Sequence, residues 1–284
     1  MLKQLAARKS VAAMTREIES GPKLNRVLDR RALTSVGLGS MIGSGIFVLT
    51  GTVAAQHTGP AVTLAFLVAA IGCGLAALCY AELASMIPIS GSAYSYTYAT
   101  LGEGVAWFVG WNLALEYVMS GAAVAVGWSG YVVNLLAEFG LHLPDALTNA
   151  PLGKGADNHL VATGALVNVP AVFIVALLTW VCYVGVKHST RVNNVMVIIK
   201  VLIIVLFIAV GIKYVTPVLW QPYLPANTGT SGHFGFSGIM QGAAIIFFAY
   251  IGFDQAATTA QEARNPQRDV PWGIIAALLI STAL

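Results

Sequence analysis

The first residues in this sequence that could do chemistry are the glycines and serines within one apolar stretch, Leu33 to Thr50. The small residues that interrupt it are Gly37, Gly39, Ser40, Gly43, Ser44 and Gly45. Each glycine inside a helix costs about 1 kcal/mol relative to alanine, so we expect a membrane helix that breaks here. Backbone groups at such a break must be buried in protein or line a wet cavity, because hydrocarbon offers them no partner. The freed N–H groups would bind an anion such as a carboxylate, helped by the positive end of the second half-helix.

The spacing of the small residues also bears on three other interpretations of this stretch. Gly39 and Gly43 form G-x-x-x-G, which marks close packing of membrane helices and is compatible with a break. A dinucleotide-binding fingerprint is excluded because Ile42 stands where its last glycine should be. A G-x-S-x-G nucleophile elbow is excluded because no serine in the stretch has a glycine two positions away on both sides.

Glu116 is a carboxylate inside another apolar segment, residues 103–137. It shares one helical face with small and polar residues at spacings of three and four. These residues are Asn112, Ser120, Ala123 and Gly127. A glutamate within a span is costly and almost always faces the bundle interior. It either takes part in chemistry within the membrane or only holds two helices together.

Lys200 is a basic residue inside an apolar segment, as Glu116 is an acidic one. It lies in the run V-M-V-I-I-K-V-L-I-I-V-L. It lies about ten residues from each end of its segment, too deep to reach either interface easily. Asn193 falls on the same helical face. Burial disfavours the charged form of a lysine, which brings proton exchange near neutral pH within physical reach. The alternative is a permanent structural pair with a carboxylate such as Glu116 or Asp254.

The segment F-F-A-Y-I-G-F-D, residues 247–254, is a second apolar stretch that glycine interrupts. Gly252 is expected to break its helix, with Asp254 just beyond the break. Asp254 could attract a cationic side chain or belong to an inner gate. The sequence favours the gate, because this residue lies past the break toward the predicted cytoplasmic side.

Composition places these residues in a multispanning membrane protein. Hydrophobic residues make up 57% of the chain, charged residues only 10%, and the mean hydropathy is +0.76, whereas soluble domains carry about 25% charged residues. The net charge of +3 is not a nucleic-acid signal, because the basic residues flank the apolar segments. The three cysteines lie in apolar segments and are expected to be small buried hydrophobes. The five histidines lack metal-ligand spacing, so we expect no cofactor and no enzyme.

Hydrophobic segments of spanning length divide the chain into a tail, residues 1–31, and a transmembrane domain, residues 32–284. The seven segments are roughly 33–56, 60–87, 103–137, 168–186, 191–214, 237–262 and one that opens at Trp272. The last is too short to span, so we expect the chain to be part of a longer protein. Residues 138–167 read as an external loop, and Val11 to Ile18 as part of a helix that could lie on the membrane.

The basic residues predict the orientation. With the N-terminus inside, 12 of the 15 Lys and Arg residues face the cytoplasm. The outer side holds only Lys154 and Lys213. The positive-inside rule therefore places the tail in the cytoplasm, and we expect a multi-pass protein of the plasma membrane.

Taken together, in this order, the motifs resemble the amino acid-polyamine-organocation superfamily, most closely its cationic amino acid transporter branch with its bacterial homologues. Besides Lys200, the motifs are G-S-M-I-G-S-G-I-F (39–47), Y-A-E-L-A-S-M-I-P-I-S-G-S-A-Y (80–94), G-W-N-L-A-L-E-Y (110–117), F-A-Y-I-G-F-D (248–254) and E-A-R-N-P-Q-R-D-V-P (262–271). The resemblance implies an all-α integral membrane fold, an inverted repeat of five plus five helices. Helices 1 and 6 are unwound in that fold, and this chain would cover about helices 1 to 6 and part of 7.

The resemblance also implies a substrate site at the two breaks. The backbone N–H groups that would hold a substrate carboxylate are those of Ile42, Gly43, Ser44 and Gly45. The carbonyls that would receive its ammonium are those of Phe248, Ala249 and Ile251. Tyr250 or Phe253 resembles the aromatic residue that closes over the substrate, and Phe253 would join Asp254 in the gate.

The function expected from the resemblance is secondary active transport of amino acids, coupled to protons. Lys200 would donate to carbonyls freed near Gly39 to Ile42, in place of the sodium ion of other relatives, with Glu116 as the second titrating group. The expected partners are the amino acid, protons and the lipid bilayer. An exchanger of the same fold would share every motif, whereas a channel or an intramembrane enzyme is disfavoured.

Overall fold

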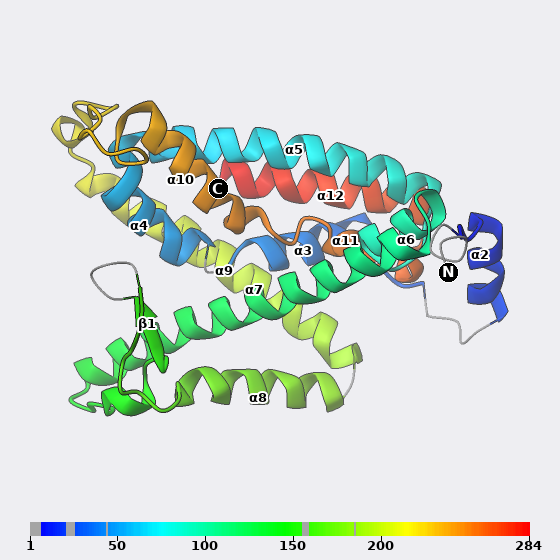
Figure 1. The fold of residues 1–284 in the computed structure, drawn as a ribbon, viewed down its shortest axis with the longest axis horizontal. Coiled ribbons are helices and arrows are strands. Elements are labelled where there is room, and N and C mark those ends of the chain that lie inside the picture. Colours follow the sequence, from blue (N-terminus) through cyan, green and yellow to red (C-terminus); the bar gives the residue numbers. More distant parts are fainter. Residues whose placement is uncertain (1–6, 21–25, 44, 155–158, 185) are drawn as a thin grey trace. The chain divides into compact units, whose positions relative to one another are not determined.

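The computed structural model describes residues 7–20, 26–43, 45–154, 159–184 and 186–284, and most of them are helical. The α-helices are α2 (Val11–Ser20), α3 (Arg30–Met41), α4 (Thr50–Val53), α5 (Val62–Met86), α6 (Ser92–Thr100), α7 (Glu103–Glu138), α8 (Val169–Val184), α9 (Val186–Gly211), α10 (Gly235–Tyr250), α11 (Gln255–Thr258) and α12 (Pro266–Ala283). The π-helical segments are η1 (Gly45–Leu49) and η2 (Ala54–Thr58). The 3-10 segments are η3 (Gly59–Ala61), η4 (Asp145–Leu147), η5 (Ile212–Tyr214), η6 (Pro217–Trp220) and η7 (Ala260–Glu262). Figure 1 shows the ribbon with its labels.

Four helical stretches among the described residues are long and apolar enough to cross a membrane. They are Arg30–Met86, Glu103–Glu138, Val192–Tyr214 and Gly235–Thr258. The first contains two of the segments expected from the sequence, joined at Gly59, whose φ of +61° favours glycine. A shorter apolar helix, Val169–Tyr183, matches another. The predicted spans therefore correspond to helices of this structure.

The start of the last helix differs from the sequence prediction. The apolar pattern placed it at Trp272, but α12 begins at Pro266 with Asn265 as its N-cap residue. Proline is favoured in the first turn of a helix, where its missing N–H has no partner to lose. A polar first turn therefore precedes the apolar part, which hydropathy alone cannot detect.

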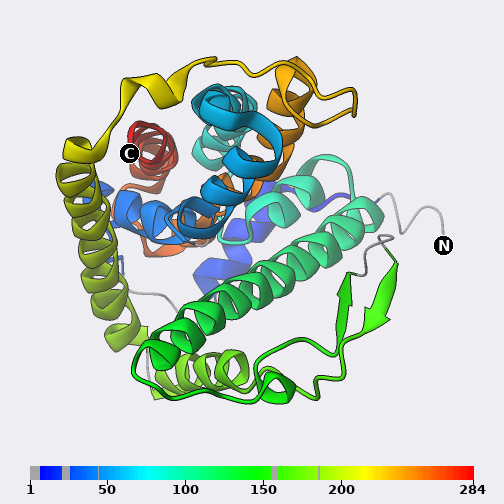
Figure 2. The same cartoon turned by 90° about the vertical axis from the view of Figure 1, so that its left-hand side faces the viewer.

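The chain forms two compact units, one made of Met1–Leu113 with Val192–Leu284 and the other of Ala114–Arg191. In the first unit α12 packs against α5 and α3, and Figures 1 and 2 show α12 running alongside α5. Glycine allows this close approach. A Cβ built on Gly37 would lie 2.7 Å from the Cβ of Ala277, and one on Gly273 would lie 2.9 Å from the Cβ of Leu33.

Helix α5 separates small from large side chains. Its buried face is a stripe of Ala65, Ala69, Cys73, Ala77, Ala81 and Ala84. Its exposed large residues are Leu67, Val68, Ile71, Leu75, Leu78 and Met86. Small residues let membrane helices approach closely, while large apolar residues suit a lipid-facing surface. The predicted burial of the cysteines is right for Cys73 and wrong for Cys79 and Cys182, which are exposed on apolar helices outside the packed faces.

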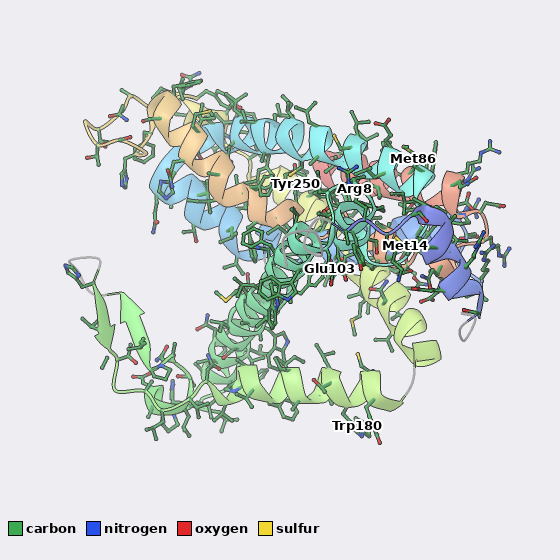
Figure 3. The ribbon with its side chains drawn as sticks, turned by 45° about the vertical axis from the view of Figure 1, so that its right-hand side comes forward. Arg8, Met14, Met86, Glu103, Trp180 and Tyr250 are labelled. Atoms are coloured by element: carbon green, nitrogen blue, oxygen red, sulfur yellow. The ribbon has the colours of Figure 1, made fainter. Side chains whose placement is uncertain are left out.

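The second unit contains the loop that the sequence left without a motif. Within it β1 (Leu152–Lys154) and β2 (Leu160–Ala162) form an antiparallel hairpin. Asn168 ties the loop to the helices, because it donates to Thr148 O at 2.8 Å and accepts from Ser129 Oγ at 2.6 Å. Helix α8 projects large side chains such as the exposed Trp180 outward (Figure 3).

The N-terminal segment belongs to the first unit. Helix α2 buries Met14, labelled in Figure 3, and Glu103 N donates to Ala7 O at 3.0 Å. Lys9 and Glu17 form an ion pair, and the hydrogen bond to Glu17 raises the pKa of Lys9. The helix extends the predicted Val11–Ile18 segment, whose location on the membrane stays a prediction.

Candidate functional site

Both stretches that the sequence expected to break lie between separate helical elements. Helix α3 ends at Met41, Ile42 is non-helical with φ −76° and ψ 90°, and helical structure resumes at Gly45. Ser44, one of the predicted site residues, lies outside the described residues. Helix α10 ends at Tyr250 and α11 begins at Gln255, with Gly252 at φ +108° between them. That φ lies in the region that favours glycine.

The two interruptions pack directly against one another. A Cβ built on Gly45 would lie 2.4 Å from Cα of Ala249. A Cβ built on Gly252 would lie 2.5 Å from Cβ of Ser40. Contacts this short exclude any larger residue without movement of the backbone. Gly43 is different, because a Cβ built there meets no atom within 4 Å. Its backbone therefore faces open space at the predicted carboxylate position.

The other predicted backbone ligands lie around this junction. Ile42 is buried, whereas Phe248, Ala249 and Ile251 are half-buried at the end of α10. Phe248 O accepts the N–H of Ile251 at 3.3 Å. One of the carbonyls proposed for an ammonium group thus already caps its own helix, and a substrate would have to share it or replace that bond.

Both candidate closing aromatics are buried against other rings. Tyr250 donates its hydroxyl to Phe66 O at 3.4 Å, and the Phe66 and Tyr250 rings meet edge to face at 6.4 Å. Phe253 meets Tyr80 edge to face at 5.4 Å. Tyr80 also meets Tyr96 at 6.1 Å. Neither Tyr80 nor Tyr96 was singled out from the sequence, because nothing in the pattern connects them to Phe253.

Asp254 is buried, with 5% of its surface exposed. Ser92 Oγ donates to its Oδ2 at 3.0 Å. Ser92 has an unusual φ of +50° and begins α6. Tyr96 lies four residues after Ser92, and its hydroxyl is buried. Burial raises the pKa of Tyr96, and the charges of Tyr80 and Asp254 raise it further. Ser92 lies inside a motif quoted from the sequence, yet its pairing with Asp254 could not be read there.

Lys200 connects α9 to the end of α3. Its Nζ donates to Gly39 O at 3.0 Å. In a continuous helix that carbonyl would accept from residue 43, but α3 ends at Met41 and leaves it available. Asn193 Oδ1 lies 2.6 Å and Val197 Cγ2 lies 3.1 Å from a Cβ built on Gly39, so a larger residue there would have to displace these side chains of α9. Gly39 O is one of the carbonyls that the sequence analysis assigned to Lys200. The part of this hydrogen bond in proton coupling stays a prediction.

Glu116 belongs to the second unit and is half-buried on α7. Asn112, one turn earlier on the predicted polar face, donates to Phe108 O at 2.8 Å within the same helix. A pairing of Glu116 with Lys200 therefore stays a prediction.

Comparison with known proteins identifies the family. A family model described as amino acid permease matches residues 28–284. The methylthioribose transporter of Bacillus subtilis is 51% identical over 92% of this chain and 53% of its own length. The branched-chain amino acid permease BcaP of the same organism is 48% identical over 98% of this chain and 56% of its own. The vacuolar cationic amino acid transporter 4 of Arabidopsis thaliana is 40% identical over 100% of this chain and 46% of its own.

The chain thus spans about half the length of these relatives. The match covers both interruptions, Lys200 and Asp254. The matched relatives are permeases and transporters rather than enzymes, and the chain belongs to the amino acid permease family.

Proposed function

We propose that the full-length protein is a secondary active transporter that carries amino acids across the plasma membrane. The observation that carries this proposal is the junction of the two interrupted helices, where the backbone of Gly43 borders open space. Helix interruptions that face one another in a membrane protein supply N–H donors for a carboxylate and carbonyl acceptors for an ammonium group. The α-carboxylate and α-amino groups of an amino acid match this pair.

The proposed fold is the five-plus-five inverted repeat, with α3 through η2 as helix 1 and α10 with α11 as helix 6. The residues proposed to hold the substrate are Ile42, Gly43, Ser44, Gly45, Phe248, Ala249, Tyr250, Ile251 and Phe253. Asp254 is proposed as a gate residue, because it lies past the α10 interruption, buried against Ser92. The tail is proposed to be cytoplasmic on the distribution of basic residues.

Proton coupling is proposed to run through Lys200 and Glu116. A protonated Lys200 holds the carbonyl of Gly39 at the end of α3, and loss of its proton would weaken that contact, because a neutral amine is a poorer donor than an ammonium group. The two helices could then move relative to one another. An obligate exchanger of the same fold is the alternative, and only uptake measured with and without internal substrate separates the two.

A thiosugar is the second candidate substrate, because a methylthioribose transporter is 51% identical to this chain. Methylthioribose has hydroxyl groups but neither a carboxylate nor an ammonium group. The backbone groups at the junction suit the charged ends of an amino acid better, since helix N-termini favour anions.

Ligand binding to the full-length protein separates these substrates. A ligand that binds the native state raises the melting temperature, so alanine, leucine, arginine and methylthioribose are compared by thermal shift. We expect a rise with free amino acids and none with their amides or N-acetyl derivatives. A rise with methylthioribose alone would contradict amino acid transport.

A further inference from the structure

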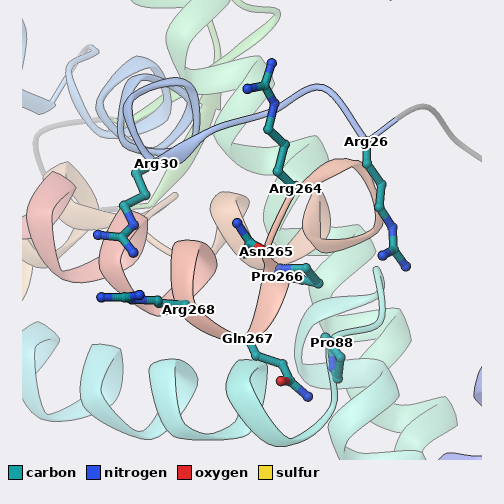
Figure 4. Close-up of a pocket in the computed structure, with 8 residues that line it drawn as sticks. All are labelled: Arg26, Arg30, Pro88, Arg264, Asn265, Pro266, Gln267 and Arg268. Carbon is teal, nitrogen blue, oxygen red and sulfur yellow. The ribbon is translucent and has the colours of Figure 1, made fainter.

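A pocket of about 550 Å³ lies outside the proposed substrate site, at the ends of the helices where the basic residues gather. Four arginines from two distant parts of the sequence line it: Arg26, Arg30, Arg264 and Arg268. Figure 4 shows them around Asn265 and Pro266, which begin α12. The transport mechanism proposed above uses none of these side chains.

The backbone beneath the pocket fixes the two segments to one another. Leu28 N donates to Glu262 O at 3.0 Å, and Arg264 N donates to Leu28 O at 2.9 Å. Leu28 and Ala263 form a parallel bridge, and both are buried. Arg26 and Arg264 therefore extend from a defined backbone, not from independent loops.

The acidic groups near the pocket leave most of its positive charge unbalanced. Asp269 is buried and accepts from Arg30 Nε at 2.7 Å and from Asn265 N at 3.2 Å. Asp29 caps α3 by accepting from Ala32 N at 2.8 Å. Within the described ranges, no carboxylate lies within 4.0 Å of the guanidinium nitrogens of the other three arginines. Glu262 accepts a backbone hydrogen bond from Leu28 N, and its carboxylate forms no ion pair with these arginines in the part of the chain that the structure describes.

Exposed apolar side chains lie close in sequence to several residues that line the pocket. Val27 follows Arg26, and Met86 ends the apolar helix α5 just before Pro88, another lining residue. Trp272 is also exposed, one helical turn beyond Arg268, and its ring centroid lies 5.9 Å from the guanidinium carbon of Arg30. Tryptophan beside basic residues is typical of the level where lipid headgroups meet hydrocarbon. A free anion would use the arginines but would leave these apolar side chains uncovered.

We propose that this arginine pocket binds the phosphate headgroup of an anionic phospholipid, with the acyl chains lying over Val27, Met86 and Trp272. Guanidinium groups form strong, often paired hydrogen bonds with phosphate oxygens. The start of α12 adds the positive end of a helix dipole. Anionic lipids are enriched in the leaflet that faces the cytoplasm, which is where the positive-inside rule places this pocket. The site does not depend on which substrate the protein carries.

The test counts phospholipids bound to the full-length purified protein by native mass spectrometry, with phosphatidylglycerol and phosphatidylcholine added in turn. We expect phosphatidylglycerol to bind more tightly. Each of Arg264→Gln and Arg268→Gln should weaken that binding about fivefold, because each juxtamembrane arginine contributes one favourable charge interaction. Arg16→Gln removes an exposed arginine of α2 outside the pocket and should leave binding unchanged.

Two further measurements test whether the ligand is a lipid. Trp272→Ala should weaken phosphatidylglycerol binding, and millimolar inorganic phosphate should fail to compete with it. Each variant is also melted in lipid-free detergent, and Arg26→Gln replaces any variant that unfolds. Equal affinity for the two lipids, unchanged affinity in the arginine variants, or full competition by inorganic phosphate would overturn the proposal.

Discussion

Gly43 and Gly45 lie two residues apart, yet a side chain at each would meet different surroundings. The space beside Gly43 is open, whereas Gly45 touches the backbone of Ala249. The sequence analysis assigned both glycines to the same carboxylate position. The structure separates them, because only at Gly43 can a side chain enter without displacing a neighbouring helix.

We predict that Gly43→Leu in the full-length protein abolishes amino acid binding with little change in stability. Gly45→Ala should instead destabilise the protein by about 1–3 kcal/mol, because it overpacks the junction. Thermal unfolding and ligand-induced thermal shifts measure both quantities. Normal amino acid binding by Gly43→Leu would place the substrate elsewhere.

Asp254 is the second residue whose role can be tested alone. We predict that Asp254→Asn leaves alanine and arginine binding equally intact but alters transport rates, since the buried carboxylate contacts Ser92. Ser92→Ala is the matched comparison, because it removes the hydrogen bond from Ser92 and keeps the charge of Asp254, whereas Asp254→Asn removes the charge and keeps an acceptor oxygen. Isothermal titration with both amino acids measures binding, and uptake into proteoliposomes measures the transport rate. Loss of arginine binding alone would assign Asp254 to substrate selectivity instead.

At the scale of elements, the packing of α3 on α12 depends on glycine. Gly37→Ala would place its Cβ 2.7 Å from Ala277. We expect a loss of about 1–3 kcal/mol in stability, because two close-packed helices must separate. Gly72→Ala on α5 is the control, since a Cβ there meets no atom within 4 Å, and it should be neutral or stabilising by up to about 1 kcal/mol. Equal effects of the two changes on thermal unfolding would contradict this packing.

An ion pair between Arg30 and Asp269 also joins α3 to α12. Arg30→Ala leaves the buried carboxylate of Asp269 without its cation. Loss of one partner of a buried pair costs 3–5 kcal/mol in general, but Arg30 is 40% exposed, so we expect about 1–3 kcal/mol. Thermal unfolding checks this, with the exposed neighbour variant Arg31→Ala as the control. A change no larger than that of the control would show that water replaces the arginine.

The sequence predicts the long helices better than it predicts the contacts between them. Hydropathy predicted the long spans, because a bilayer requires about 20 apolar residues for each. It missed the polar first turn of α12, and it missed the β1–β2 hairpin, whose strands have three residues each. The contacts of Gly37 with Ala277 and of Tyr80 with Phe253 join distant segments, so no local pattern could reveal them.

For the whole molecule, the family follows from the combination of motifs, and the comparisons bear it out. The approximate positions of the two interruptions were predictable because glycine disfavours a helix, although Gly37 and Gly39 in α3 and Gly72 in α5 lie within unbroken helices. The contact between the two interruptions was not predictable from glycine content alone, since it depends on Gly45 meeting Ala249. The substrate and its driving ion depend on the whole transporter, of which this chain corresponds to about half of each relative.

The central claim is that protons drive amino acid uptake through Lys200. The most direct measurement is uptake by the full-length protein in substrate-free proteoliposomes, with a proton gradient or a sodium gradient imposed separately. We predict accumulation with the proton gradient only, and its loss in Lys200→Ala while substrate binding is retained, because that variant lacks the ammonium group held by Gly39. Accumulation that requires sodium, or full accumulation by Lys200→Ala, would contradict the account.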